Sequence, residues 1–324
     1  MNILERITPR KMNYVLFWFL VSAVVFAVWE GLSIWMKATD FRLTRVTLSL
    51  FGYWILPVSM IWVRRAFLSA IQNLNTVIEF PTRDYPSWIR NKDEAIFAIN
   101  NRSAIIRLLL TFAAVVIFSL LSSHIFFQSF LPNLIAYIIG SFVFILGILG
   151  QLVIESLLGF LNEIEKYRVR LPVFRIQHYE LLKLFQFYYR TALFIFVLVF
   201  MMLAFLLTTP FGTEFAVILL VSLTTFYPLA LLLWSAYKIH GMMLSAKENH
   251  IDDINQQIQV CFERVRTDPS KENSESLDAL LDVQKKISSE LDWPIDVESV
   301  SALLVTFLIP SINFISTLWG KLSK

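Results

Sequence analysis

Six long apolar runs dominate this chain and restrict what it can fold into. A helix needs about 20 apolar residues to cross the hydrocarbon core of a bilayer, because each residue advances it by about 1.5 Å. The runs cover Tyr14–Met36, Val46–Val63, Ile105–Phe127, Leu134–Leu158, Thr191–Leu207 and Phe215–Tyr237. They predict an all-α integral membrane helical bundle with six transmembrane helices.

Composition argues against a soluble globular protein. Hydrophobic residues make up 56% of the chain and charged residues 16%, with a mean hydropathy of +0.62. Soluble domains are about 45–50% apolar and about 25% charged. The charged residues also cluster between the apolar runs, so they indicate where the chain leaves the bilayer.

A seventh apolar run, Val300–Trp319, is long enough to span but carries Pro310 near its middle. It can form a seventh C-terminal membrane helix, a re-entrant helix or a helix along the interface. Pro57 and Pro228 lie inside the second and sixth runs and, with Pro310, are candidate helix kinks. A kink can act as a gate, but membrane helices more often tolerate proline as a matter of shape.

The distribution of Lys and Arg predicts the orientation, because basic residues are retained on the cytoplasmic side. Seven lie in the connection 64–107 and six in the connection 166–190, whereas the loops 128–133 and 208–213 contain none. We therefore expect a cytoplasmic N-terminus in the cytoplasmic (inner) membrane, with anionic lipid headgroups at the basic connections. The first outer loop opposes this topology, but the other loops outweigh its three basic residues, Lys37, Arg42 and Arg45.

Motifs that carry common chemistry are missing from the sequence. It contains no GxGxxG, GxxxxGK[ST], HExxH or GxSxG pattern, its one cysteine is Cys261, and its four histidines lie on different segments. We therefore expect no enzyme activity, no catalytic residues, no metal and no cofactor. Basic residues at a membrane surface meet anionic lipid first, so we also expect no nucleic acid partner.

Small and polar residues form one stripe on the predicted fourth helix. They recur at intervals of seven and four, and they are Gly140, Gly147, Gln151, Glu155 and Gly159. As a helix-packing stripe, the glycines let a neighbouring backbone approach and Gln151 hydrogen-bonds across the contact. As a pore stripe, it lines a water-filled path with Glu155 at the cytoplasmic mouth, paired with Arg64 or Arg65.

The inner connections are predicted to contain helices of their own. One-sided apolar positions over 66–80 predict a helix that extends the second run, after which Pro81 and Pro86 break the chain and 93–107 leads into the third run. The next inner connection follows the same plan. There 162–170 extends the fourth run, Pro172 breaks it, and 177–190 leads into the fifth.

Beyond the sixth run, a polar background with apolar residues at seven-residue spacing predicts two helices with narrow apolar seams. The seams are Leu244, Ile251, Ile254, Ile258, Cys261 and Val265, then Leu277, Leu280, Ile287 and Leu291, with a turn over 268–274. We predict a six-helix bundle over 1–240, a cytoplasmic helical hairpin over 241–296 and a C-terminal apolar helix over 297–324. Alternatively, the seams pack onto the bundle's own basic inner loops, to which the acidic hairpin is attracted.

The last quarter of the chain resembles a known group. Residues 292–296, Asp-Trp-Pro-Ile-Asp, follow the predicted hairpin and precede the proline-bearing apolar helix from Val300. This order is similar to the ending of some uncharacterised prokaryotic multi-pass membrane proteins. Those proteins end in a helical hairpin, a Trp-Pro-x-Asp turn and a proline-bearing apolar helix. The resemblance implies an architecture and no activity.

Two functional classes remain open from sequence. The sparse polar interior favours a non-enzymatic membrane assembly, sensor or signalling subunit, in which the hairpin 241–296 engages a protein partner or self-associates. The alternative is an ion channel or transporter with its path along the fourth-helix stripe. In either class the seams and the stripe predict a homo-oligomer.

Overall fold

The computed structural model describes residues 12–35, 49–80, 84–97, 130–167, 178–207 and 215–289, together with positions 4, 7–9, 46, 105–106, 109–110, 113, 169 and 316. Within the helices, side-chain surroundings are described except at 130–141, 143–144, 178–179, 200–207, 215–227, 229 and 289. The described residues are helical apart from turns and one isolated β-bridge.

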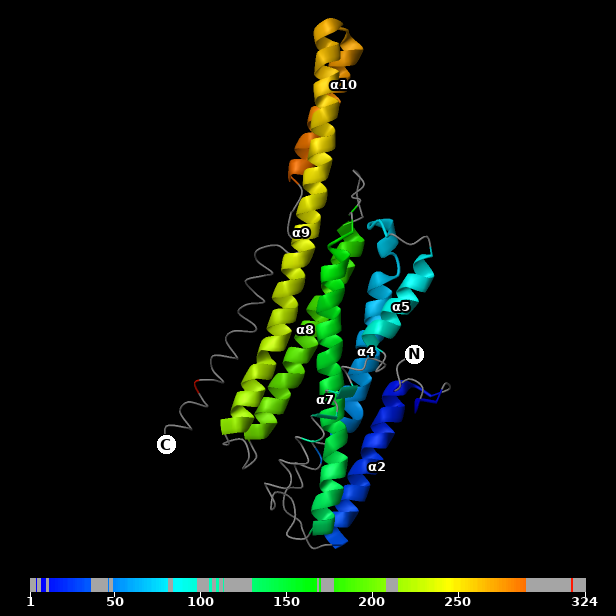
Figure 1. Ribbon diagram of the computed structural model, residues 1–324, viewed down its shortest axis with the longest axis vertical. Helices are drawn as coiled ribbons and strands as arrows, with labels where there is room; N and C mark the ends of the chain where they lie inside the picture. The colour runs from blue at the N-terminus through cyan, green and yellow to red at the C-terminus, as the bar shows by residue number, and fades with distance from the viewer. Residues whose placement is uncertain are drawn as a thin grey trace. The chain divides into compact units, whose positions relative to one another are not determined.

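The helices form two compact units that interleave along the chain. In chain order they are α2 (Tyr14–Trp35), the π-helix η1 (Phe51–Ile55), α4 (Leu56–Ile71), the 3-10 helix η2 (Leu74–Thr76), α5 (Tyr85–Phe97), α7 (Phe130–Ile164), α8 (His178–Leu207), α9 (Phe215–Thr267) and α10 (Lys271–Ser289) (Figure 1). The first unit holds Met1–Ser69, Pro86–Gly159 and Ala204–Pro210. The second holds Ala70–Tyr85, Phe160–Leu203 and Phe211–Lys324.

Four stretches of the described chain are long and apolar enough to cross a membrane. They are Tyr14–Trp35, Phe51–Thr76, Ile145–Ile164 and Glu180–Val199. They overlap the predicted first, second, fourth and fifth runs. The third run, 105–127, falls largely outside the described residues, as do the seventh run and the 292–296 motif, while the sixth lies in α9 with most of its side chains undescribed. The protein is thus all-helical with four candidate spans, and the count of six stays a prediction.

In the first unit, α2, α4 and α7 pack around a shared apolar core. Trp18 of α2, Ile61 of α4 and Leu146 of α7 are buried together there. The Ser22 hydroxyl of α2 donates a 2.9 Å hydrogen bond to the Ser49 carbonyl. Bonds of this kind hold helices together where apolar burial alone gives little preference for protein over lipid.

Pro57 is the second residue of α4, which directly follows η1. The Leu56 N–H donates to the Phe51 carbonyl, five residues back, which is the bond that defines a π-turn. Because a proline ring crowds the carbonyl four residues before it, the wider turn makes room for Pro57. Helix α9 continues through Pro228. Whether these prolines kink their helices stays a prediction, and Pro310 lies outside the described residues.

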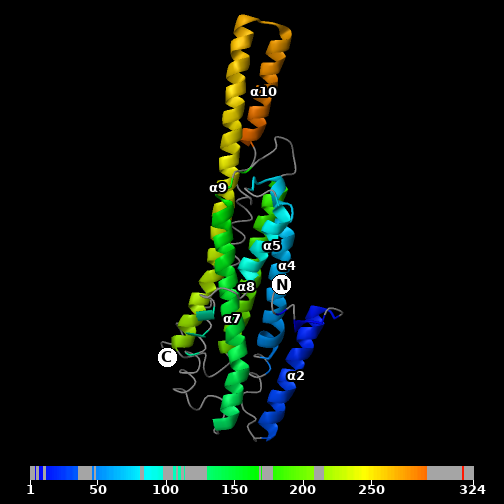
Figure 2. The same cartoon turned by 45° about the vertical axis from the view of Figure 1, so that its right-hand side comes forward.

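In the second unit, α8 lies alongside the first half of α9, and α10 runs back along its second half, as Figures 1 and 2 both show. Leu184 and Tyr188 of α8 are fully buried, as are Leu231 and Ile239 of α9. The segment 70–85 contributes Leu74, Val77 and Ile78 to the same unit, and all three are buried.

The first inner connection differs from its prediction. Helix α4 ends at Ile71, and the chain continues through a turn, η2 and the bridging residue Ile78, not as a helix to residue 80. Pro86 does not break the chain but occupies the first turn of α5. Proline is tolerated there because the first-turn N–H groups have no intrahelical acceptor. The second half of the predicted helix 93–107 falls mostly outside the described residues.

At the start of the second inner connection, the helix ends earlier than predicted. Helix α7 ends at Ile164, and Val169 pairs with Ile78 in an antiparallel bridge, so the predicted extension over 162–170 is wrong. The bridge requires an extended backbone, which a helix to residue 170 would not allow. Helix α8 begins at His178, in agreement with the predicted helix 177–190.

Helix α9 runs unbroken across the predicted boundary at residue 240. It has 53 residues, which corresponds to about 80 Å at about 1.5 Å per residue. It ends at Thr267, and α10 begins at Lys271, within the predicted turn 268–274. Helix α10 starts early because the Ser270 hydroxyl accepts the Asn273 N–H at 3.3 Å and caps it. The cytoplasmic placement of this pair of helices stays a prediction.

Candidate functional site

All five stripe residues lie on α7. Gln151 Nε2 donates a 3.2 Å hydrogen bond to Glu155 Oε1, so the two polar members interact along the helix surface. Both side chains are half-buried, whereas Gly147 and Gly159 are exposed. The surroundings of Gly140 lie outside the described part of the helix.

The stripe lies away from the packed face of α7. Leu146, Leu149 and Leu157 are buried, and at about 100° per residue the stripe is centred roughly 150° around the helix from them. A Cβ built at Gly147 or Gly159 would meet nothing within 4 Å among the described residues. The glycines are therefore not close-packing positions against any described helix of the chain, and the role of the stripe stays a prediction.

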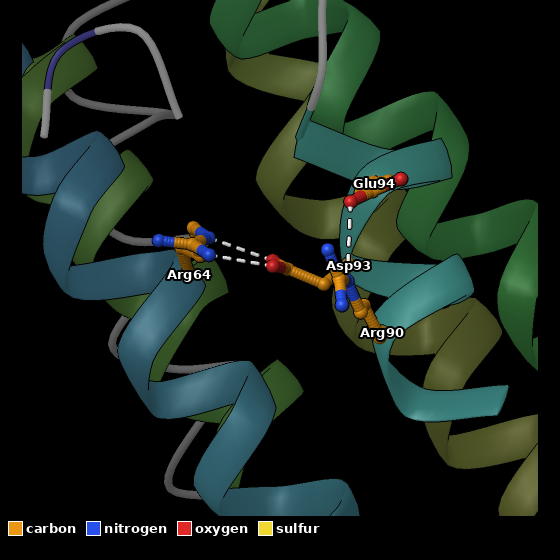
Figure 3. Close-up of polar contacts among 4 residues, drawn as sticks. All are labelled: Arg64, Arg90, Asp93 and Glu94. Atoms are coloured by element: carbon orange, nitrogen blue, oxygen red, sulfur yellow. Dashed lines mark hydrogen bonds and ion pairs between the residues drawn. The ribbon is translucent and has the colours of Figure 1, made fainter. Parts of the chain in front are cut away.

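A buried ion pair joins α4 to α5 in the first unit. Arg64 Nε lies 2.6 Å from Asp93 Oδ1 and Arg64 Nη2 lies 2.5 Å from Asp93 Oδ2, a two-pronged arrangement drawn in Figure 3. The two side chains are only 12% and 11% exposed. By contrast, Arg90 and Glu94 on the same helix are 80% and 53% exposed and 3.5 Å apart.

This pairing was not foreseen from sequence. The structure brings the Asp93 carboxylate to Arg64, and the suggested pairing of Glu155 with Arg64 or Arg65 stays a prediction. The Arg65 guanidinium lies over the Tyr14 ring, 4.6 Å from its centroid. No spacing rule connects Arg64 with Asp93, because they lie on different helices.

The two inner connections meet each other in the second unit. Ile78 bridges to Val169, and the Phe80 and Tyr167 rings lie 5.3 Å apart. The Tyr85 hydroxyl donates to the Ile71 carbonyl. Burial raises the pKa of Tyr85 and outweighs the backbone hydrogen bonds from Asn75 and Leu74, which lower it. The hydroxyl therefore stays protonated and keeps its role as a donor.

The end of α7 is tied to α9 by Lys238. Its ammonium lies 2.6 Å from Glu165 Oε2 and sits over the Trp234 ring at 5.0 Å. Trp234 and Tyr237 are exposed at 41% and 63%. Exposed Trp and Tyr beside a Lys are typical of the membrane interface, where an apolar ring and a polar group are both accommodated.

Helix α8 carries buried polar groups that sequence reasoning missed. Glu180, Tyr188 and Thr191 lie on one side of it, at intervals of eight and three. Glu180 Oε1 accepts from Lys183 at 3.2 Å, but Glu180 Oε2 and the Thr191 hydroxyl are buried without a hydrogen-bond partner among the described residues. Such groups are usually satisfied by water. Their burial is set by neighbouring helices, which the sequence pattern of α8 alone does not report.

The described residues include no group of three or more His, Cys, Asp or Glu that could hold a metal ion. Comparison with known proteins finds no match: no family model matches the chain, and no similar curated protein or solved structure was found. The function must therefore be argued from the helices themselves.

Proposed function

We propose that this protein is a non-enzymatic membrane protein that acts as an assembly, sensor or signalling subunit through its cytoplasmic helices. The observation that carries the proposal is the continuity of α9, which has 53 residues from Phe215 to Thr267. The hydrocarbon core is only about 30 Å thick, and a helix of this length is about 80 Å long. Any tilt or rotation of the membrane half therefore moves the outer half with it.

The order of side chains along α9 indicates where this helix would leave the bilayer. Leu233 and Trp234 are exposed, Tyr237 and Lys238 follow, and the next exposed positions include Glu248. This order, from apolar through aromatic to charged, is the one expected across a membrane interface. From Lys238 to Thr267 the helix is about 44 Å long, at about 1.5 Å per residue.

The rigidity of this helix can be measured directly. Spin labels on cysteines replacing the exposed Ser245 and Gln259, in a Cys261→Ser chain in lipid nanodiscs, should lie about 21 Å apart along the axis with a narrow distance distribution. Two glycines inserted between the labels provide the control and should broaden the distribution. A broad distribution without the insertion would contradict the proposal, because the two halves of α9 would then move independently.

The proposal includes the cytoplasmic (inner) membrane, with the N-terminus and the α9–α10 turn inside. The basic inner connections support this placement, and the bridge between Ile78 and Val169 supports putting both connections on one side. A cysteine replacing Ser270 in the Cys261→Ser chain should react with an impermeant maleimide only after the cells are permeabilised. Reaction from outside intact cells would refute the orientation.

An ion channel or transporter with its path along the α7 stripe is the second candidate. The position of Gln151 and Glu155 away from the packed face favours it, as does the open space beside Gly147 and Gly159. Altered ion flux in liposomes for Gln151→Ala and Glu155→Ala, with assembly unchanged, supports a path. Loss of folding or of oligomers instead supports a packing role.

A further inference from the structure

The second half of α9 and helix α10 form an arm, residues 241–289, that does not bury its own apolar seam. Only Ile254 and Ile287 of the seam are buried. The remaining described seam residues are half-buried: Leu244, Ile251, Ile258, Cys261, Val265, Leu277 and Leu280. Two helices cover only one side of each other, whereas four helices enclose a core.

Contacts between the two helices set their register. Lys247 Nζ donates to the Ser288 carbonyl at 2.9 Å, and Cys261 Sγ lies 3.9 Å from the Asn273 carbonyl oxygen. Together with the hydrogen bond between Gln284 and Asn255, these contacts of an antiparallel pair place residue 262 near the level of residue 274, and residue 255 near the level of residue 281. The arm therefore consists of successive layers, each with one residue from α9 and one from α10.

One flank of the arm is uncharged and carries two exposed apolar side chains. Phe262 is 56% and Leu281 is 43% exposed. With the seam as positions a and d of a heptad, Phe262, Leu281, Asn255 and Ser274 all take position e, and the e positions of antiparallel helices lie on the same side. We call these four residues the e flank.

We infer that the e flank binds the e flank of a second copy of this chain, so that two arms form a four-helix bundle. The inference deepens the proposed function and rests on it, because two copies in one membrane hold their arms parallel. A two-fold axis along the arms then places two copies of each residue in the same layer. Any charged residue on the contact would therefore meet its like.

Charge and size both select this flank. The opposite flank carries His250 and Arg264, and the outer face of α9 carries Asp252 and Glu263. Glu248 also takes an e position and is charged. It lies seven residues before Asn255, about 10 Å from that layer at about 1.5 Å per residue, and therefore outside the contact. Only the e flank can therefore meet its own copy without opposing like charges.

The two contact layers also alternate large and small side chains. One layer would hold two Phe262 and two Ser274, and the other two Leu281 and two Asn255, a combination that fills a core without crowding. Asn255 Oδ1 already accepts a 2.7 Å hydrogen bond from Gln284 Nε2 within the arm. Its amide oxygen would therefore keep a hydrogen-bond partner when the contact buries it.

Cross-linking of the full chain in lipid nanodiscs tests the inference. In the Cys261→Ser chain, Phe262→Cys should form a covalent dimer with a short bismaleimide. Val260→Cys is a matched control, because Val260 is 55% exposed on the same helix but lies on the outer face. Equal cross-linking at both positions, or none at residue 262, would overturn the inference.

Mass measurement provides a second readout. Light scattering should give twice the chain mass for the parent and for Val260→Asp, and a single chain mass of 37.6 kDa for Phe262→Asp. A parent protein with the mass of a single chain would overturn the inference. This mass measurement also decides the case in which Phe262→Cys does not cross-link because residues 290–324 cover it. Failure here leaves the spin-label distances unchanged, whereas failure of the proposed function shows as a broad distance distribution.

Discussion

The Arg64–Asp93 pair allows a quantitative test of the first unit. Asp93→Ala removes the carboxylate that accepts both hydrogen bonds from Arg64, whose side chain is only 12% exposed. Removing one partner of a buried pair costs about 3 to 5 kcal/mol, because the remaining charge stays desolvated. Two charge-assisted hydrogen bonds of about 1.5–3 kcal/mol each give a similar figure. We therefore expect the free energy of unfolding to fall by about 3 to 5 kcal/mol.

The neighbouring residue provides a matched control. Glu94 lies on the same helix, but its partner Arg90 is 80% exposed, and solvent screens the pair. Glu94→Ala should therefore cost no more than about 1 kcal/mol. Both variants place alanine, a good helix former, on α5. The difference between their free energies of unfolding therefore reports the environment of the carboxylate that was removed.

Steric trapping in lipid bicelles measures the free energy of unfolding of both variants. A double-mutant cycle with Arg64→Ala isolates the pairwise part, which should be a substantial fraction of the Asp93→Ala cost. Equal costs for Asp93→Ala and Glu94→Ala would refute the reasoning. So would additive effects of Arg64→Ala and Asp93→Ala, because two residues that do not interact show no coupling energy.

Two further predictions concern α7 and the inner connections. Gly147→Ala should stabilise the helix by up to about 1 kcal/mol in thermal unfolding, because alanine is the better helix former and the added Cβ meets no described atom; a clear loss of stability would indicate a segment packed there. Tyr85→Phe should cost about 1 kcal/mol near neutral pH through the lost bond to the Ile71 carbonyl. Because burial raises the pKa of Tyr85 in the folded state, the hydroxyl contributes stability below the ordinary value of 10.0, and that contribution is lost as pH rises above it. The parent and variant should therefore converge at alkaline pH, and a constant difference would contradict the assignment.

Local signals predicted several features of the fold correctly. The apolar run of α2 coincides with a candidate span, that of α8 overlaps one in part, and α8 begins within one residue of the predicted helix. The turn after Thr267 was also placed correctly at its start, since Asp268 and Pro269 are turn residues. In each case the signal lies in a few consecutive residues.

Errors arose where the outcome depended on a distant partner. The helix predicted over 66–80 stops at Ile71, and the extension of α7 stops at Ile164, because Ile78 and Val169 pair with each other instead. The apolar spacing of 66–80 is compatible with a helix and equally with a buried turn. The buried groups Glu180 and Thr191 escaped notice for the same reason, since their exposure is set by other segments.

The sequence by itself determined which segments are long and apolar enough to cross a membrane, because apolar length is a property of one segment at a time. Only the tertiary structure decided which face of α7 is packed and which carboxylate meets Arg64. A desolvated guanidinium pairs with a carboxylate that packing brings within hydrogen-bond distance, and no local sequence pattern identifies that carboxylate in advance. That carboxylate belongs to Asp93 of α5.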